Sequence, residues 1–111
     1  MFTPAKTVAY EGLIALAAHQ AAKAGAWECT EEAVALELTI TFAIPASWSA
    51  KKRAAAVGQW CCKKPDIDNI IKSVADGCNG VLWRDDQQIA RVTATKTWHE
   101  QPGVLVSVER T

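Results

Sequence analysis

The sequence predicts an α/β (α+β) domain in which a small mixed β-sheet is flanked by helices. An alanine-rich segment comes first, a run of alternating apolar residues follows at 34–44, and strand-like segments occur at 87–98 and 104–109. Helical segments lie between these strands, and packing helices on a sheet buries the apolar side of both. A length of 111 residues fits a single domain over 1–111.

The first helix is expected over 3–24. Thr3 can cap it, and Pro4 suits the first helical position, where a backbone N–H has no partner. Alanine has the highest helix propensity, and Gly25 marks the expected end. The apolar face is predicted to consist of Val8, Leu13 and Leu16, with Ala17 or Gln20.

The strands are predicted from alternation and β-branched residues. In 34–44 apolar residues fall on one side and polar residues on the other, and Pro45 ends the run. Segment 87–98 is rich in β-branched residues, and valines alternate in 104–109, with Pro102-Gly103 in the connecting turn.

The middle of the chain is predicted to contain a short basic helix and an irregular segment. Residues 45–56 indicate a loop followed by a helix capped by Ser47 or Ser49. Residues 58–65 are expected to be irregular.

A further helix is expected to begin at Asp66 or Asp68, since either aspartate can act as its N-cap. It is predicted to run through Ala75, and Asn79-Gly80 supplies a turn after it. The predicted order is therefore helix, strand, short helix, helix, strand, strand.

The charges balance overall but are unevenly placed. Twelve basic and twelve acidic residues give a formal net charge of zero, which argues against a generic nucleic-acid coat protein. Between Pro45 and Lys72 the acids are Asp66 and Asp68, while the basic residues are Lys51, Lys52, Arg53, Lys63, Lys64 and Lys72. This stretch is strongly positive once a metal neutralises the two carboxylates. No glycine-rich phosphate loop is present, so an extended polyanion suits it better than a small phosphorylated substrate.

The four cysteines are expected to be free thiols in a cytoplasmic protein. No Cys-x-x-Cys motif and no signal-peptide pattern occurs. A zinc site using Cys61, Cys62 and His99 lacks the usual ligand spacing. The apolar stretch 13–26 is too short to span a bilayer, so no membrane partner is expected.

Acidic residues gather around the second half of the chain in a pattern that indicates a metal site. Asp66 and Asp68 lie two apart at a helix start, Lys72 follows four residues later, and Asp85-Asp86 opens the next strand. Converging carboxylates need a cation between them, and Mg²⁺ prefers oxygen ligands. Magnesium beside a lysine suits phosphodiester chemistry.

Each part of this pattern also has an ordinary structural interpretation. Asp66 or Asp68 can be a plain N-cap, and Asp85-Asp86 can be a solvated loop. Lys72 can form an i,i+4 pair with Asp68, which stabilises a helix by only about 0.2–0.5 kcal/mol.

The combined pattern resembles the RusA Holliday junction resolvases of phages and prophages. The resemblance covers about Val34 to Val108 and includes a basic segment after Pro45. The residues that carry it are Lys64-Pro65-Asp66-Ile67-Asp68-Asn69, Lys72, Asp76, Asn79-Gly80 and Asp85-Asp86-x-Gln88-Ile89.

This resemblance implies a homodimeric, Mg²⁺-dependent endodeoxyribonuclease that cuts four-way DNA junctions by paired nicks in recombination and repair, with Mn²⁺ as a substitute. The family's catalytic, metal-binding aspartates fall on Asp66, Asp68 and Asp86, and its catalytic lysine on Lys72. Asp86 is favoured over Asp85 as the ligand, and Asp76 matches an acidic position of the family for which we expect a structural role.

The sequence also departs from the family pattern. Members usually begin with a strand before the first helix, and this domain is expected to lack that strand or to take its equivalent from a partner subunit. An alternative is therefore a catalytically inactive module of the same fold that binds branched DNA or a protein. A phosphohydrolase for small substrates and a purely structural protein are further alternatives.

The expected DNA contacts lie in the basic stretch. The residues predicted to grip phosphates are Lys51, Lys52, Arg53, Lys63 and Lys64. Trp48 or Trp60 either stacks on an unpaired base or packs in the core or dimer. A dimer follows from the two-fold symmetry of a junction, with helix 3–24 or the last strands as its interface.

Overall fold

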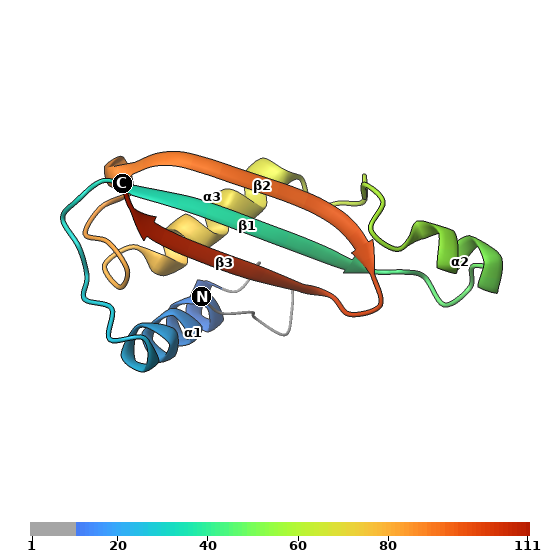
Figure 1. Ribbon diagram of the computed structural model, residues 1–111, viewed down its shortest axis with the longest axis horizontal. Coiled ribbons are helices and arrows are strands. Elements are labelled where there is room, and N and C mark those ends of the chain that lie inside the picture. The colour runs from blue at the N-terminus through green and yellow to red at the C-terminus, as the bar shows by residue number, and fades with distance from the viewer. Residues whose placement is uncertain (1–10) are drawn as a thin grey trace.

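Three strands form one mixed sheet, and the fold confirms the predicted α+β class. In the computed structural model, which describes residues 11–111, the central strand β1 (Val34–Ala43) pairs in parallel with β2 (Ile89–His99) and antiparallel with β3 (Gly103–Arg110). Figure 1 shows the three strands side by side in the order β2-β1-β3. The predicted order of elements along the chain is confirmed.

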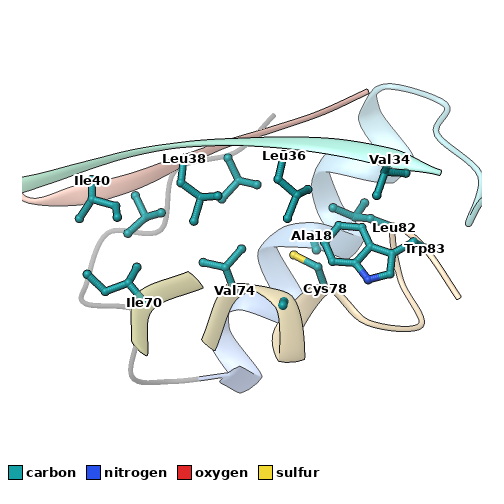
Figure 2. Close-up of a cluster of buried hydrophobic side chains, with 13 residues drawn as sticks. Ala18, Val34, Leu36, Leu38, Ile40, Ile70, Val74, Cys78, Leu82 and Trp83 are labelled. Carbon is teal, nitrogen blue, oxygen red and sulfur yellow. The ribbon is translucent and has the colours of Figure 1, made fainter. Parts of the chain in front are cut away.

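Two helices cover one face of this sheet. α1 (Glu11–Ala24) and α3 (Ile67–Cys78) contact each other and lie below the strands in Figure 2. The alternation predicted for β1 supplies the sheet side of the core with Leu36, Leu38 and Ile40, all nearly inaccessible to solvent. Ile70 and Val74 of α3 face them (Figure 2). Burying each such side chain contributes about 1.5–3 kcal/mol.

The apolar face predicted for the first helix is wrong at Leu16. Leu16 is 55% exposed, whereas Ala18 is fully buried and Ala22 packs against the same core. Ala17 is half-buried and Gln20 is exposed. The small side chain of alanine lets α1 approach α3 closely. The buried face of α1 is therefore formed by alanines, and the larger Leu16 points away from it.

The part of this prediction that concerns the start of the helix lies outside the described residues. Thr3, Pro4 and Val8 lie outside the described residues, and so does the region in which a first strand was expected to be missing. The side chain of Leu13 is not described either. Within 11–111 none of the helices has the length and apolarity needed to cross a membrane.

The short basic helix α2 (Ala50–Ala56) projects from one end of the sheet (Figure 1). Ser49, rather than Ser47, caps it, because the Ser49 hydroxyl accepts a hydrogen bond from Lys52 N at 3.2 Å. No residue of α2 is buried. The following segment, 57–66, has no regular secondary structure, as predicted, apart from a single bridge between Trp60 and Thr97.

Strand β2 begins two residues later than predicted. Residues Asp86–Gln88 form a 3₁₀ turn, η1, and the Gln88 side chain accepts a hydrogen bond from Asp85 N at 2.7 Å. The Gln88 amide also donates to the carbonyls of Thr30 and Glu32 at 2.8 and 2.9 Å, which ties η1 to the loop before β1. The turn at Asn79-Gly80 is confirmed, with Gly80 at φ 80°.

The end of α1 differs in detail from the sequence prediction. Gly25 follows the helix as expected, but the residue in the left-handed region is Ala26, at φ 53°. The amide of Trp27 donates to Ala22 O at 2.8 Å and that of Ala26 to Lys23 O at 3.4 Å, which is the Schellman arrangement. An alanine therefore occupies the position that usually favours glycine.

Replacing Ala26 by glycine should stabilise the protein. Relief of the left-handed conformation is worth about 1–2 kcal/mol, and the added freedom of the unfolded chain costs about 0.4–1 kcal/mol. We expect a net gain of roughly 0.5–1 kcal/mol in the free energy of unfolding, measured by urea denaturation. Gly25→Ala, which has an ordinary φ and no close contact at its Cβ, should cause no loss and serves as the control. A lower urea midpoint for Ala26→Gly would contradict the assignment.

Candidate active site at the start of α3

Asp66 and Asp68 lie together at the N-terminal end of α3. Asp66 occupies the N-cap position with an extended backbone, and Asp68 lies in the first helical turn. Both side chains are exposed and line one open pocket with a volume of about 520 Å³. The pocket also contains Trp60, Cys61, Ile67, Ala94, Thr95 and Lys96.

These two carboxylates are not used to satisfy the fold. Asp66 makes no side-chain capping hydrogen bond, although it occupies the N-cap position. Within residues 11–111 no salt bridge involves Asp66, Asp68 or Lys72, so the i,i+4 pair between Asp68 and Lys72 is not formed. The site therefore offers two free oxygen-donor groups at a helix N-terminus, with the exposed ammonium of Lys72 one turn further along the same helix.

Asp86 lies elsewhere in the same chain. Its Oδ1 accepts a hydrogen bond from the indole nitrogen of the buried Trp83 at 3.1 Å. It also lies near Cys78, the last residue of α3, since burial and then the negative charge of Asp86 raise the pKa of Cys78 to about 12. α3 has 12 residues and is therefore about 18 Å long, with Asp66 before its first residue. The chain thus brings Asp66 and Asp68 together but leaves Asp86 near the opposite end of the helix.

No three potential metal ligands of the histidine, cysteine or carboxylate type come together in the part of the chain that the structure describes. Asp85 is exposed beside η1, and Asp76 is exposed on α3. All four cysteines are free thiols, and the buried Cys61 accepts a hydrogen bond from Lys63 N at 3.4 Å. Of the aspartates singled out from the sequence, Asp66 and Asp68 are the two that line one pocket.

The predicted basic residues lie on α2 and in the segment that leads from it to Asp66. Lys51, Lys52 and Arg53 are exposed on the projecting helix α2 (Figure 1). Lys63 and Lys64 are exposed in the segment that leads from α2 into α3. Lys63 and Lys64 thus shortly precede Asp66 in the chain, whereas the cations of α2 lie on the helix that projects beyond the sheet (Figure 1).

The two candidate tryptophans differ. Trp48 is half-buried, packs edge to face on Trp98 with a centroid separation of 5.2 Å, and lies under Lys52 Nζ at 4.0 Å. Of the two roles considered for these tryptophans, Trp48 therefore has that of packing within the protein. Trp60 is 73% exposed and borders the pocket of Asp66 and Asp68, so of these two tryptophans it is Trp60 that presents an open ring there.

One residue near the carboxylates was missed by the sequence analysis. Lys96, near the end of β2, borders the same pocket and donates hydrogen bonds to the carbonyls of Lys63 and Pro65. The available signal was a lysine inside an otherwise β-branched strand. Nothing in the sequence indicated its partners, because backbone carbonyls leave no residue pattern.

Comparison with known proteins adds independent information. A family model described as endodeoxyribonuclease RusA matches residues 1–109. The crossover junction endodeoxyribonuclease rusA of Lactococcus phage r1t is 30% identical over 82 residues, which cover 73% of this chain and 59% of that protein. The uncharacterized protein YqaN of Bacillus subtilis (strain 168) is 38% identical over 45 residues, or 40% of this chain and 32% of that protein. The chain thus matches less than two thirds of either relative's length, and no solved structure matches it.

The raised pKa of Cys78 should make stability fall at alkaline pH. The unfolded thiol ionises near its ordinary pKa of 9.0, whereas the folded thiol stays protonated up to about 12. Between these values the thiol loses its proton in the unfolded state but keeps it in the folded state. This difference lowers the free energy of unfolding by about 1.4 kcal/mol at pH 10. Urea midpoints at pH 8 and pH 10 measure this loss.

The comparison of two cysteine variants isolates the effect. Cys78→Ala should lose less stability between pH 8 and pH 10 than the wild type does. Cys29→Ala, which removes an exposed thiol, should keep the wild-type loss. Equal losses in all three proteins would show that Cys78 ionises as readily in the folded state as in the unfolded state.

Proposed function

The chain belongs to the RusA endodeoxyribonuclease family, and from that membership we propose that it is a metal-dependent nuclease resolving four-way DNA junctions by paired nicks. The observation that carries this proposal is that Asp66 and Asp68 line one open pocket and form no salt bridge within residues 11–111, with the exposed Lys63 and Lys64 just before them in the chain. The cations attract the negatively charged DNA, and the two carboxylates can bind the metal ion that would catalyse cleavage of the DNA backbone.

The carboxylate pair fits magnesium or manganese. Mg²⁺ in phosphoryl-transfer sites is usually held by one or two carboxylates, with waters and substrate phosphates as its remaining ligands. Asp66 and Asp68 would hold the ion, which when bound supplies an activated water and neutralises charge on the phosphate. The free carboxylates and the open pocket leave room for those waters and for a phosphate.

Lys72 and the basic residues act on the DNA itself. Lys72 is exposed one turn after Asp68, so its ammonium can donate to a phosphate oxygen, either to position the phosphate or to stabilise the transition state. The proposed backbone contacts are Lys51, Lys52, Arg53, Lys63 and Lys64. Trp60 offers an exposed ring for an unpaired base next to the carboxylates.

The active species is proposed to be a homodimer. A four-way junction has two-fold symmetry, and two equivalent nicks need two sites related by the same symmetry. The distance of Asp86 from Asp66 within one chain gives a second reason. If Asp86 is the third metal ligand, as the family resemblance implies, it reaches the carboxylate pair from the partner subunit.

A second function has a specific observation in its favour. The absence of a three-ligand group within residues 11–111 also fits an inactive module that binds branched DNA without cutting it. Incubation of the purified protein with a synthetic four-way junction separates the two functions. Cleavage that requires Mg²⁺ or Mn²⁺ and spares plain duplex supports the nuclease, and junction binding without cleavage supports the module.

Asp68→Asn should abolish cleavage and preserve junction binding. Loss of a direct ligand should slow single-turnover cleavage at least about a hundredfold, because even residues that only support ligands contribute 10–100-fold. Binding without divalent ions should be unchanged or tighter, since a negative charge near phosphates is removed. Asp76→Asn, on the same helix, is the control and should cut normally. Wild-type cleavage by Asp68→Asn would exclude this site.

Replacing Lys51, Lys52 and Arg53 together by alanine should weaken junction binding and reduce its dependence on salt. Each lost phosphate contact lowers the slope of log K against log salt by about 0.9, so up to about 2.7 is expected for three. Titrations at several salt concentrations measure the slope. Lys23→Ala, an exposed lysine on α1, should leave it unchanged. An unaltered slope in the triple variant would remove α2 from the DNA interface.

Mixing two inactive variants tests whether Asp86 acts across the dimer. In a mixed dimer of Asp68→Asn and Asp86→Asn subunits, a shared arrangement leaves one site with all of its native aspartates. We expect nicking of one strand per junction to return after the subunits are mixed and exchanged. If each site uses the aspartates of a single chain, both sites stay defective and no nicking returns. Each variant incubated alone is the control.

A further inference from the structure

Lys96 makes contacts that set it apart from the exposed cations around it. Its Nζ donates to Lys63 O at 2.5 Å and to Pro65 O at 2.9 Å. Its own backbone carbonyl accepts a hydrogen bond from Cys61 N at 3.0 Å. A single residue of β2 thereby contacts three positions of the segment 61–65, which has no regular secondary structure of its own.

The ammonium of Lys96 is held in a defined place. The residue is half-buried, and its Nζ lies 5.2 Å from the ring centroid of Phe42 on the neighbouring strand. An ammonium has three N–H donors, and two of them point at carbonyl oxygens of the segment. Lys96 therefore links the sheet to the segment through its side chain as well as through its backbone.

The Pro65 carbonyl is the contact that matters for the site. This C=O belongs to the same planar peptide unit as the backbone nitrogen of Asp66. Holding the oxygen fixes the orientation of that peptide and hence the direction in which the chain enters α3. Asp66 and Asp68 come directly after this peptide, so its orientation determines the direction in which their carboxylates point.

Lys96 does not neutralise the carboxylates that it supports. It borders the same pocket as Asp66 and Asp68, yet no salt bridge in the described part of the chain joins it to either. Because its donors are engaged by backbone carbonyls, the two carboxylates stay open to a cation. A lysine that paired with them would instead compete with a metal.

We propose that Lys96 is a positioning residue that fastens the segment 61–65 to β2 and thereby holds Asp66 and Asp68 in the geometry that binds a divalent cation. Its effect on cleavage rests on the proposed nuclease function, whereas its effect on the segment and on cation binding does not. Displacement of a reacting group by about 1 Å can cost a hundredfold in rate, so loss of this tether should affect chemistry strongly.

The first test measures the tether and the ion directly. In Lys96→Met, amide hydrogen exchange should become faster in residues 61–68 while the remaining core keeps its wild-type protection. Mn²⁺ binding, followed by electron paramagnetic resonance of the free ion, should weaken about 10–100-fold, the range found for residues that orient metal ligands. Lys96→Arg, which keeps charge and donors, should recover most of this affinity. Lys23→Met should behave like the wild type.

The second test separates chemistry from DNA binding. Lys96→Met should slow single-turnover junction cleavage about a hundredfold and raise the metal concentration needed for half-maximal rate. Junction affinity without divalent ions should stay within about twofold, because most cations of the basic stretch remain. If Lys96→Met does not fold, Lys96→Gln, whose amide can still donate to one carbonyl, replaces it in the same comparisons.

The outcomes distinguish this proposal from the function on which it builds. Unchanged exchange and unchanged Mn²⁺ affinity in Lys96→Met overturn the positioning role, as does faster exchange spread evenly over the whole core. A wild type that binds Mn²⁺ but cuts no junction overturns the nuclease function alone, and exchange and Mn²⁺ affinity still decide the role of Lys96. A wild type without measurable Mn²⁺ binding overturns both.

Discussion

The packing of α3 against β1 is the interaction on which the rest of the structure depends. Ile70 and Val74 meet the apolar side of the central strand, which makes α3 run along the sheet instead of crossing one end of it (Figures 1 and 2). The two ends of α3 thereby lie at different points along β2. The start of the helix lies beside Ala94, Thr95 and Lys96, and its last residue, Cys78, lies near Asp86, just before the start of β2.

This arrangement explains which candidate site residues lie close together in one chain and which do not. Asp66 and Asp68 lie two residues apart in sequence, so the first turn of one helix suffices to bring them together. Asp86 comes after α3 and the turn that follows it. At Asp86 the chain is still near the end of α3, because β2, which leads back toward the start of the helix, begins only at Ile89. One chain therefore carries the carboxylate pair near the start of α3 and Asp86 near its end, and the proposed homodimer is the arrangement that would bring the two together.

The sequence predicted the features that depend on local patterns. Alternation in β1, a serine cap on α2 and the turn at Asn79-Gly80 each depend on a few neighbouring residues, and the structure confirms them, with Ser49 as the cap. Leu16 was assigned wrongly because hydrophobicity alone does not show how closely two helices approach. The position of Asp86 could not be predicted, because residues 79–85 are long enough to return along α3, and only the contacts of Asp86 with Trp83 and near Cys78 show that the chain does not. The contacts of Lys96 could not be predicted either, since they join a strand to carbonyls far away in sequence.

The free carboxylates at the start of α3 also connect folding to the proposed chemistry. The first amides of a helix lack partners within it, and a side chain at the N-cap usually accepts from one of them. Asp66 makes no such bond, so the first turn forgoes this stabilisation while holding two like charges close together. The positive end of the helix dipole offsets part of their repulsion. A cation between the carboxylates would offset more, and a phosphate bound to that cation would approach the same helix N-terminus, where anions are favoured. Occupation of the proposed site therefore stabilises the turn that presents it, while Lys96 keeps that turn in place before any ligand arrives.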